Sequence, residues 1–213
     1  MDSDIEKIYE AEYKKNRSGE TVASSISQKL ESWMHRNVAK SFSSISFDSV
    51  STLEIGAGTL NQIPFEVSHQ NYDIIEPMKS LYEKGKFLVR VRNCYNDISE
   101  IPLTNKYTRI ISVAVLEHLD NLPYVICQSI KLLKNDGVFA CGIPSEGGFL
   151  WGIAWRLTTG LEYKIRTGYN YGKLMKYEHL NEAWEIELIL HHFFKEVKVK
   201  RFGIGKHLSL YTY

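Results

Sequence analysis

Two glycines and three carboxylates of this sequence are spaced as a nucleotide site would require. Gly56 and Gly58 follow the apolar run in LEIGAGTL, and glycines let the backbone approach a ligand without a clash from a Cβ atom. Glu76 ends the next apolar run, where a carboxylate can accept hydrogen bonds from both ribose hydroxyls or simply face solvent. Asp97 follows the third run and could accept from the amine of an adenine or cap a turn. These residues together predict an adenosine-containing ligand.

The third carboxylate, Glu54, lies inside the first apolar run and helps to choose between ligands. The dinucleotide fingerprint GxGxxG would need a glycine at position 61, which is Asn61, so NAD is disfavoured. A carboxylate in a buried strand is costly unless it is paired. The methionine part of S-adenosylmethionine (SAM) carries a cationic amino group that could pair with Glu54. We therefore expect SAM as the ligand.

Short apolar runs alternating with helical segments must position these residues. Buried strands are indicated by VSTLEIGA, NYDIIEP, FLVRVRNCYND, YTRIISVAVL and VFACGIP, and a helix that stops at Gly137 by DNLPYVICQSIKLLKNDG. Such alternation predicts a parallel α/β sheet with helices on both faces. A parallel sheet binds its ligands at the carboxyl ends of its strands, which is where the glycines and acids lie.

The two ends of the chain extend this core within one domain, residues 1–213. Helical spacing over residues 4–15 and 21–42 predicts an N-terminal helical segment within 1–48, before a core at 49–144. Within 179–213, NEAWEIELILHHFF predicts a last helix capped by Asn181, and KEVKVKRF with HLSLYTY predicts an antiparallel hairpin. Residues 145–178 interrupt the alternating pattern and are expected to form a cap insert.

Composition narrows the class of protein. Of 213 residues, 44% are hydrophobic, which supports a buried core, and the net charge of +1 argues against a nucleic-acid partner. The three cysteines include no CxxC pair, which predicts buried thiols in a reducing compartment and no metal site. No secretory signal begins the sequence and no apolar run approaches the roughly 18 residues of a membrane span. We expect a cytoplasmic protein without stable membrane insertion.

Five segments occur in the order seen in a known family. LEIGAGTL, DIIEP, NDI, ISVAVLEHL and LLKNDGVFACGIP, within residues 50–144, resemble the class I SAM-dependent methyltransferases, most closely their small-molecule branch. Two positions depart from the pattern: Leu60 stands where many members have a third glycine, and Thr108 where many have aspartate. The resemblance implies a Rossmann-like, seven-stranded, mostly parallel sheet that ends in an antiparallel hairpin.

The resemblance also implies a cofactor site at the carboxyl ends of the first four strands. Its expected residues are Glu54, Gly56, Ala57, Gly58, Glu76, Pro77, Met78, Asp97, Ile98, Ser112 and Val113. Glu54 and the glycine backbone would face the methionine end, Glu76 the ribose and Asp97 the adenine. Met78 and Ile98 would sandwich the adenine ring.

Ser112 and Val113 would line the methionine and sulfonium region at the end of the fourth strand. The cofactor would be SAM and the product S-adenosylhomocysteine (SAH). Methyl transfer is an in-line displacement that mainly requires a positioned nucleophile. An alcohol acceptor also requires a base, for which His118 in VLEHL is the candidate. Alternatively, the His118 side chain only packs or forms a local hydrogen bond. The adjacent Glu117 would point about 100° away on a helix.

The expected cap, residues 145–178, indicates the class of acceptor. It is rich in aromatic and basic residues. Those that we expect to bind the substrate are Trp151, Trp155, Arg156, Arg166 and Tyr177. A ringed, anionic small molecule such as a phosphorylated or carboxylated sugar or metabolite would suit them. Alternatively, the aromatics fill the cap's own core while the charges are solvated, or the segment FLWGIAWRL touches a membrane surface.

The sequence therefore predicts an enzyme that transfers a methyl group from SAM to a small-molecule acceptor, on oxygen. The tetrad of the DPPY type, found in methyltransferases that act on base amines, is replaced by SVAV, which further disfavours nucleic acid as the acceptor. Two alternatives are an NAD-dependent oxidoreductase and a catalytically silent SAM-fold protein that acts as a partner or regulator. Asn61, Glu54 and the C-terminal hairpin argue against the oxidoreductase.

Overall fold

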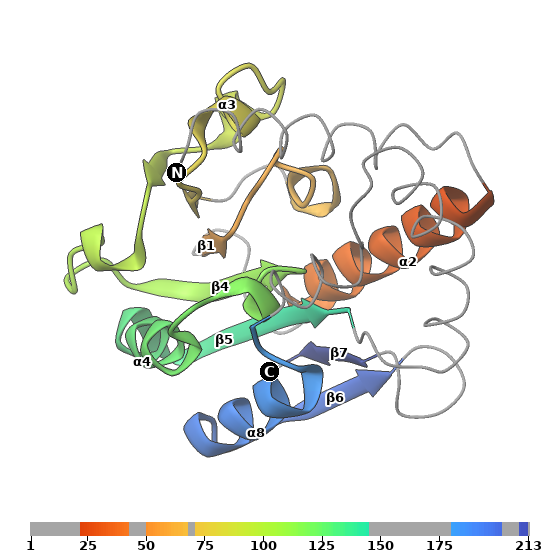
Figure 1. The fold of residues 1–213 in the computed structure, drawn as a ribbon. Helices are drawn as coiled ribbons and strands as arrows, with labels where there is room; N and C mark the ends of the chain where they lie inside the picture. The colour runs from red at the N-terminus through yellow and green to blue at the C-terminus, as the bar shows by residue number, and fades with distance from the viewer. Residues whose placement is uncertain (1–21, 43–49, 68–70, 145–179, 202–208, 213) are drawn as a thin grey trace.

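The computed structural model describes residues 22–42, 50–67, 71–144, 180–201 and 209–212. Within these ranges, seven strands form one sheet in the order β3-β2-β1-β4-β5-β7-β6. Figure 1 labels β1, β4, β5, β7 and β6 of this sheet. The strands are β1 Ser51–Ile55, β2 Asn71–Ile75, β3 Asn93–Tyr95, β4 Tyr107–Val113, β5 Leu133–Ile143, β6 Lys198–Arg201 and β7 Ser209–Thr212.

The strands β1 to β5 run parallel, and their carboxyl ends lie in register. Ile55 at the end of β1 is paired with Ile75 of β2 and with Ser112 of β4. Ile75 is paired in turn with Tyr95 of β3. β7 pairs with β5 and with β6 in the antiparallel sense. The prediction of a parallel α/β sheet is confirmed, and the residues that follow the strands are brought to one edge.

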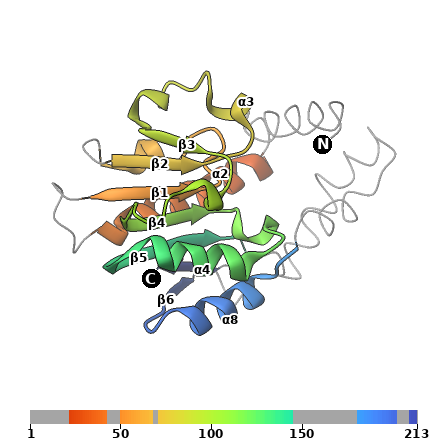
Figure 2. The ribbon, with the colours of Figure 1, turned by 90° about the vertical axis from the view of Figure 1, so that its left-hand side faces the viewer.

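Helices cover both faces of the sheet. The long helices are α2 Val22–Ala39, α4 Leu122–Leu132 and α8 Ala183–Phe193, and α3 Lys79–Tyr82 is a single turn. Short 3₁₀ turns are η1 Lys40–Phe42, η3 Ile63–Phe65, η4 Leu88–Arg90, η5 Ile98–Glu100 and η6 Leu116–His118. α4 and α8 lie side by side on one face and α2 lies on the other (Figure 2).

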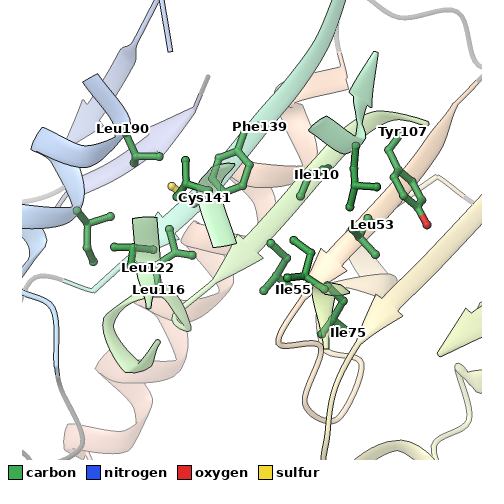
Figure 3. Close-up of a cluster of buried hydrophobic side chains, with 14 of the residues drawn as sticks. Leu53, Ile55, Ile75, Tyr107, Ile110, Leu116, Leu122, Phe139, Cys141 and Leu190 are labelled. Atoms are coloured by element: carbon green, nitrogen blue, oxygen red, sulfur yellow. The ribbon is translucent and has the colours of Figure 1, made fainter. Parts of the chain in front are cut away.

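Side-chain alternation along β1 explains why the sheet has two different cores. Leu53 and Ile55 point toward the α4 and α8 face, where they pack in a cluster with Ile110 and Phe139 (Figure 3). The other face carries a cluster that includes Met34 of α2. Successive strand residues face opposite sides, so Glu54 between the two apolar residues of β1 is directed to the α2 side.

Two element boundaries differ from the sequence prediction. α4 ends at Leu132 rather than at Gly137, because the following residues pair with β4 and extend β5. The N-cap of α8 is Glu182 rather than Asn181, and it forms a capping box with Glu185. Both helices are present as predicted, and only the residues at which α4 ends and α8 begins differ.

The predicted third strand is also shorter than expected. Of the run FLVRVRNCYND, only Asn93–Tyr95 forms β3, and residues 88–90 form the turn η4. The helix predicted over 4–15 and the cap predicted over 145–178 lie outside the described residues. Among the helices that are described, none is both long and apolar enough to cross a membrane.

Candidate active site

The candidate site lies at the carboxyl edge of the sheet, between β1 and β4. From β1 the chain continues to β2 on one side, and it later returns to β4 on the other side. This reversal of strand order is the topological switch point at which open α/β sheets bind ligands. The loops after β1, β2, β3 and β4 all begin at this edge, since the ends of these strands are in register.

The loop after β1 depends on its two glycines. Gly56 and Gly58 have φ angles of 70° and 50°, which residues other than glycine adopt only with strain. A Cβ atom added at Gly56 would lie 2.4 Å from Cγ2 of Val115. The N–H groups of Gly56 and Ala57 donate to the carbonyl of Ile75, at 2.9 and 3.3 Å. The loop after β1 is thus held against β2 and packed against Val115, two residues after the end of β4.

Leu60 keeps the backbone conformation of a glycine although it carries a side chain. Its φ angle is 63°, and its side chain is fully buried in the cluster on the α2 face. Its N–H group donates to the carbonyl of Ala57 at 2.9 Å, which closes the loop. The departure from the three-glycine pattern therefore leaves the path of the loop intact, and the buried leucine offsets part of the strain.

Two backbone amides fix the carboxylate of Glu76 at this edge. Its Oε2 atom accepts from the N–H of Gly58 at 2.8 Å, and its Oε1 atom accepts from the N–H of Met78 at 2.9 Å. Glu76 is buried, Met78 is half-buried and Pro77 is exposed. A carboxylate oxygen has two lone pairs, so each oxygen that is held by a backbone amide can accept one further hydrogen bond. Glu76 thus presents a fixed, bidentate acceptor beside the glycine loop.

Asp97 caps the turn η5, which was one of its two predicted roles. Its carboxylate accepts from the N–H of Ser99 at 2.8 Å and from the Ser99 hydroxyl at 2.5 Å, and these bonds lower the pKa of Asp97. Its side chain is exposed, whereas the neighbouring Ile98 is buried in the core. Contacts of Asp97 and Ile98 with an adenine stay predictions.

Glu54 has a partner within the protein, so its burial does not by itself require a ligand ammonium. The Tyr72 hydroxyl donates to its Oε2 atom at 2.7 Å, and Glu54 is only 2% exposed. Burial raises the pKa of Glu54 to about 8, so its carboxyl is mainly protonated at neutral pH. Pairing with a ligand ammonium requires the ionised carboxylate, and this role of Glu54 stays a prediction.

An ion pair lies on the same face, buried between the sheet and α2. Arg109 of β4 donates through both terminal nitrogens to the carboxylate of Glu66, at 2.6 and 3.1 Å. It also donates to the carbonyl of Val38 at 2.6 Å and to the Ser41 hydroxyl at 2.8 Å. This pair was not predicted, although an arginine inside the apolar run YTRIISV is a visible signal for it. Its bonds fasten α2 and the segment after it to the sheet.

The end of β4 brings a buried hydroxyl and a strained residue to the edge. Among the described residues, the Ser112 hydroxyl is buried without a hydrogen-bond partner. Val113 packs in the cluster on the α2 face, and Ala114 has a φ angle of 54°. Buried hydroxyls are normally paired and positive φ angles in alanine are uncommon, and both kinds of exception concentrate at functional sites.

His118 lies in the turn η6, not at the start of a helix as predicted. Its side chain is 39% exposed, whereas that of Glu117 is 3% exposed. The His118 Nε2 and Glu117 Oε1 atoms are 3.9 Å apart. The two side chains therefore differ as expected: the glutamate is buried and the imidazole can reach solvent. The residues predicted to bind the substrate, Trp151, Trp155, Arg156, Arg166 and Tyr177, lie outside the described residues.

Comparison of the structure with solved structures identifies the fold. One match is the crystal structure of N-methyltransferase NodS from Bradyrhizobium japonicum WM9 in complex with SAH. The alignment covers 86% of this chain and 85% of the NodS chain, with a TM-score of 0.60 and 15% sequence identity. The chain has the methyltransferase fold. No protein-family model and no curated protein sequence matches the chain.

Two further solved structures are similar to this chain. The carbon methyltransferase CurJ aligns over 86% of this chain and 54% of its own, with a TM-score of 0.59 and 18% identity. An S-adenosylmethionine-dependent methyltransferase from Clostridium acetobutylicum ATCC 824 aligns over 87% and 90%, with a TM-score of 0.55 and 14% identity. NodS and CurJ are named for different acceptor atoms, so the fold does not determine which atom is methylated.

Proposed function

We propose that this protein is a SAM-dependent methyltransferase that acts on a small molecule. The observation that carries the proposal is the Glu76 carboxylate, held by the amides of Gly58 and Met78 at the switch point of a methyltransferase-type sheet. A fixed pair of acceptor oxygens suits the two hydroxyls of a ribose. The likeness to a structure that contains SAH supports the same cofactor.

The chemical groups at the sheet edge suit the parts of this cofactor. Glu76 would bind the ribose, the glycine loop would admit the methionine part, and Asp97 would accept from the adenine amine. Ser112 offers the buried hydroxyl that lacks a partner among the described residues. Bound SAM would supply a methyl group on a positively charged sulfur, which is already electrophilic.

The acceptor is proposed from the sequence of residues 145–178. Their aromatic and basic side chains suit a ringed anion, such as a phosphorylated or carboxylated sugar or metabolite, methylated on oxygen. His118 is the proposed base, because its side chain is partly exposed in the turn that follows β4. Its role would be to take the proton of an acceptor hydroxyl.

Calorimetric titration with SAM, SAH and NAD tests the cofactor assignment. We expect SAM and SAH to bind and NAD not to bind, since the glycine loop lacks the third glycine of the dinucleotide fingerprint. Tight binding of NAD without binding of SAH would overturn the proposal.

The acceptor class has a separate test. Arg156→Ala and Arg166→Ala should raise the KM for an anionic acceptor and leave the affinity for SAM intact. Unchanged acceptor kinetics in both variants would contradict an anionic acceptor. A panel of methylatable sugars and carboxylic acids, followed by mass spectrometry of the product, supplies the acceptor for this measurement.

A further inference from the structure

Residues 180 and 181 contact the turn η6 through four hydrogen bonds. The side-chain amide of Asn181 donates to the carbonyls of Leu116 at 3.0 Å and Leu119 at 2.8 Å. The backbone N–H groups of Leu180 and Asn181 both donate to the carbonyl of Glu117, at 2.8 and 3.1 Å. Two carbonyls of this short turn and that of Leu119, which follows it, are therefore satisfied by a segment more than sixty residues away in the sequence.

The turn η6 has few hydrogen bonds of its own. Within it, the N–H of His118 donates to Val115 at 2.9 Å and that of Leu119 to Leu116 at 3.5 Å. Only Val115 separates it from Ala114, whose φ angle is positive. Leu116 is buried among the core side chains (Figure 3), and a buried carbonyl without a partner is costly. The conformation of η6 therefore depends on the bonds that it receives from residues 180 and 181.

The same turn lies against the glycine loop. The Val115 side chain occupies the space where a Cβ atom of Gly56 would lie, with Cγ2 at 2.4 Å from that position. The carboxylate of Glu76 is bonded to this loop through the amide of Gly58. Any shift of η6 would therefore move Val115 against the loop and would also move His118 at the end of the turn.

We propose that Asn181 is a positioning residue, which holds η6 so that Val115 fixes the glycine loop and His118 faces the proposed site. This inference rests on the proposed function for what the site binds. Asn181 itself touches neither the glycine loop nor Glu76 through a described hydrogen bond. Its effect passes through the carbonyls of Leu116 and Leu119.

The test compares Asn181→Asp with the matched control Asn105→Asp. An aspartate has nearly the same shape but cannot donate to a carbonyl. Asn105 carries its side-chain amide at a different place, near the Tyr95 hydroxyl. We expect Asn181→Asp to weaken SAH binding roughly ten-fold, the size of about one lost hydrogen bond, and the control to leave it within about two-fold of the parent.

Amide hydrogen exchange distinguishes positioning from general stability. In Asn181→Asp, the amides of His118 and Leu119 should exchange faster while that of Ile186 within α8 is unchanged. Parent-like SAH affinity together with parent-like exchange in the turn would overturn the proposal. If the parent protein binds no SAH, the proposed function fails, whereas the exchange measurement still tests whether Asn181 holds the turn.

A measurement on the unmodified protein covers the case in which Asn181→Asp does not fold. Since coupling between sites is reciprocal, added SAH should slow exchange at the amides of Leu180 and Asn181 more than at Ile186. Equal slowing at all three amides would contradict the proposal.

Discussion

Replacing Glu54 by glutamine should reduce the dependence of folding stability on pH in the neutral range. The carboxyl of Glu54 is buried against the Tyr72 hydroxyl, and burial raises its pKa from 4.5 to about 8. Between these two values the folded protein keeps a proton that the unfolded chain has lost. The folded state therefore binds more protons, and its stability must fall as the pH rises through this window.

The size of the effect follows from the two pKa values. For one group with these values, the free energy of unfolding falls by on the order of 2 kcal/mol between about pH 6 and pH 8. Glutamine keeps the shape and an acceptor oxygen for Tyr72 but does not titrate. In Glu54→Gln this contribution is absent, so the variant should gain stability relative to the parent as the pH rises.

Urea unfolding of both proteins at several pH values, followed by tryptophan fluorescence, measures this difference. Other titrating groups cancel in the comparison, and Glu196→Gln is the control because the side chain of Glu196 is 75% exposed. A constant difference between parent and Glu54→Gln from about pH 6 to pH 8 would refute the reasoning, since it would mean that Glu54 is ionised throughout.

The same variant tests whether Glu54 pairs with the ligand. A neutral acid replaced by a neutral amide should leave the affinity for SAH within about two-fold. A loss of affinity of more than about ten-fold, with unchanged stability, would support the prediction that Glu54 is the counter-charge of the ligand ammonium.

Three further changes test the glycine loop and its neighbours. Glu76→Gln should weaken SAH binding by roughly ten- to a hundred-fold, since hydrogen bonds to a charged group are worth about 1.5–3 kcal/mol; unchanged calorimetric affinity would exclude Glu76 from the site. Gly56→Ala should lower the free energy of unfolding in urea by more than about 2 kcal/mol, because a Cβ would overlap Val115. Adding Val115→Ala should recover part of this loss. A parent-like unfolding midpoint in Gly56→Ala would contradict the packing. Ala114→Gly should stabilise the protein by up to about 1 kcal/mol, because it relieves a positive φ angle; a lower unfolding midpoint would show that this conformation carries no strain.

The parallel core could be predicted from the sequence because its signals are local. A continuous apolar run marks a strand that is buried on both faces, and β1, β2 and β4 appear where such runs occur. Gly56, Gly58 and Glu76 were found for the same reason, since each directly follows or ends such a run. The register of the strands then brings them to one edge, as a parallel sheet requires.

Boundaries and caps were less predictable, because they depend on competition between neighbouring residues. Gly137 is a common residue after helices, but β5 already begins at Leu133 and pairs with β4 on both sides of Gly137, through Leu133 and Val138. Asn181 is a common N-cap residue, but its amide is used on η6 and Glu182 caps α8 instead. In each case a contact distant in sequence decided between local options.

The sequence by itself determined the α/β class, the places of the core strands along the chain, the glycine loop and the position of Glu76. Only the tertiary structure decided the partners of buried polar groups. It paired Glu54 with Tyr72, Arg109 with Glu66, and Asn181 with the turn η6. The physical reason is that a strand or turn is specified by neighbouring residues, whereas the state of a buried charge depends on which distant donors the packing brings within about 3 Å.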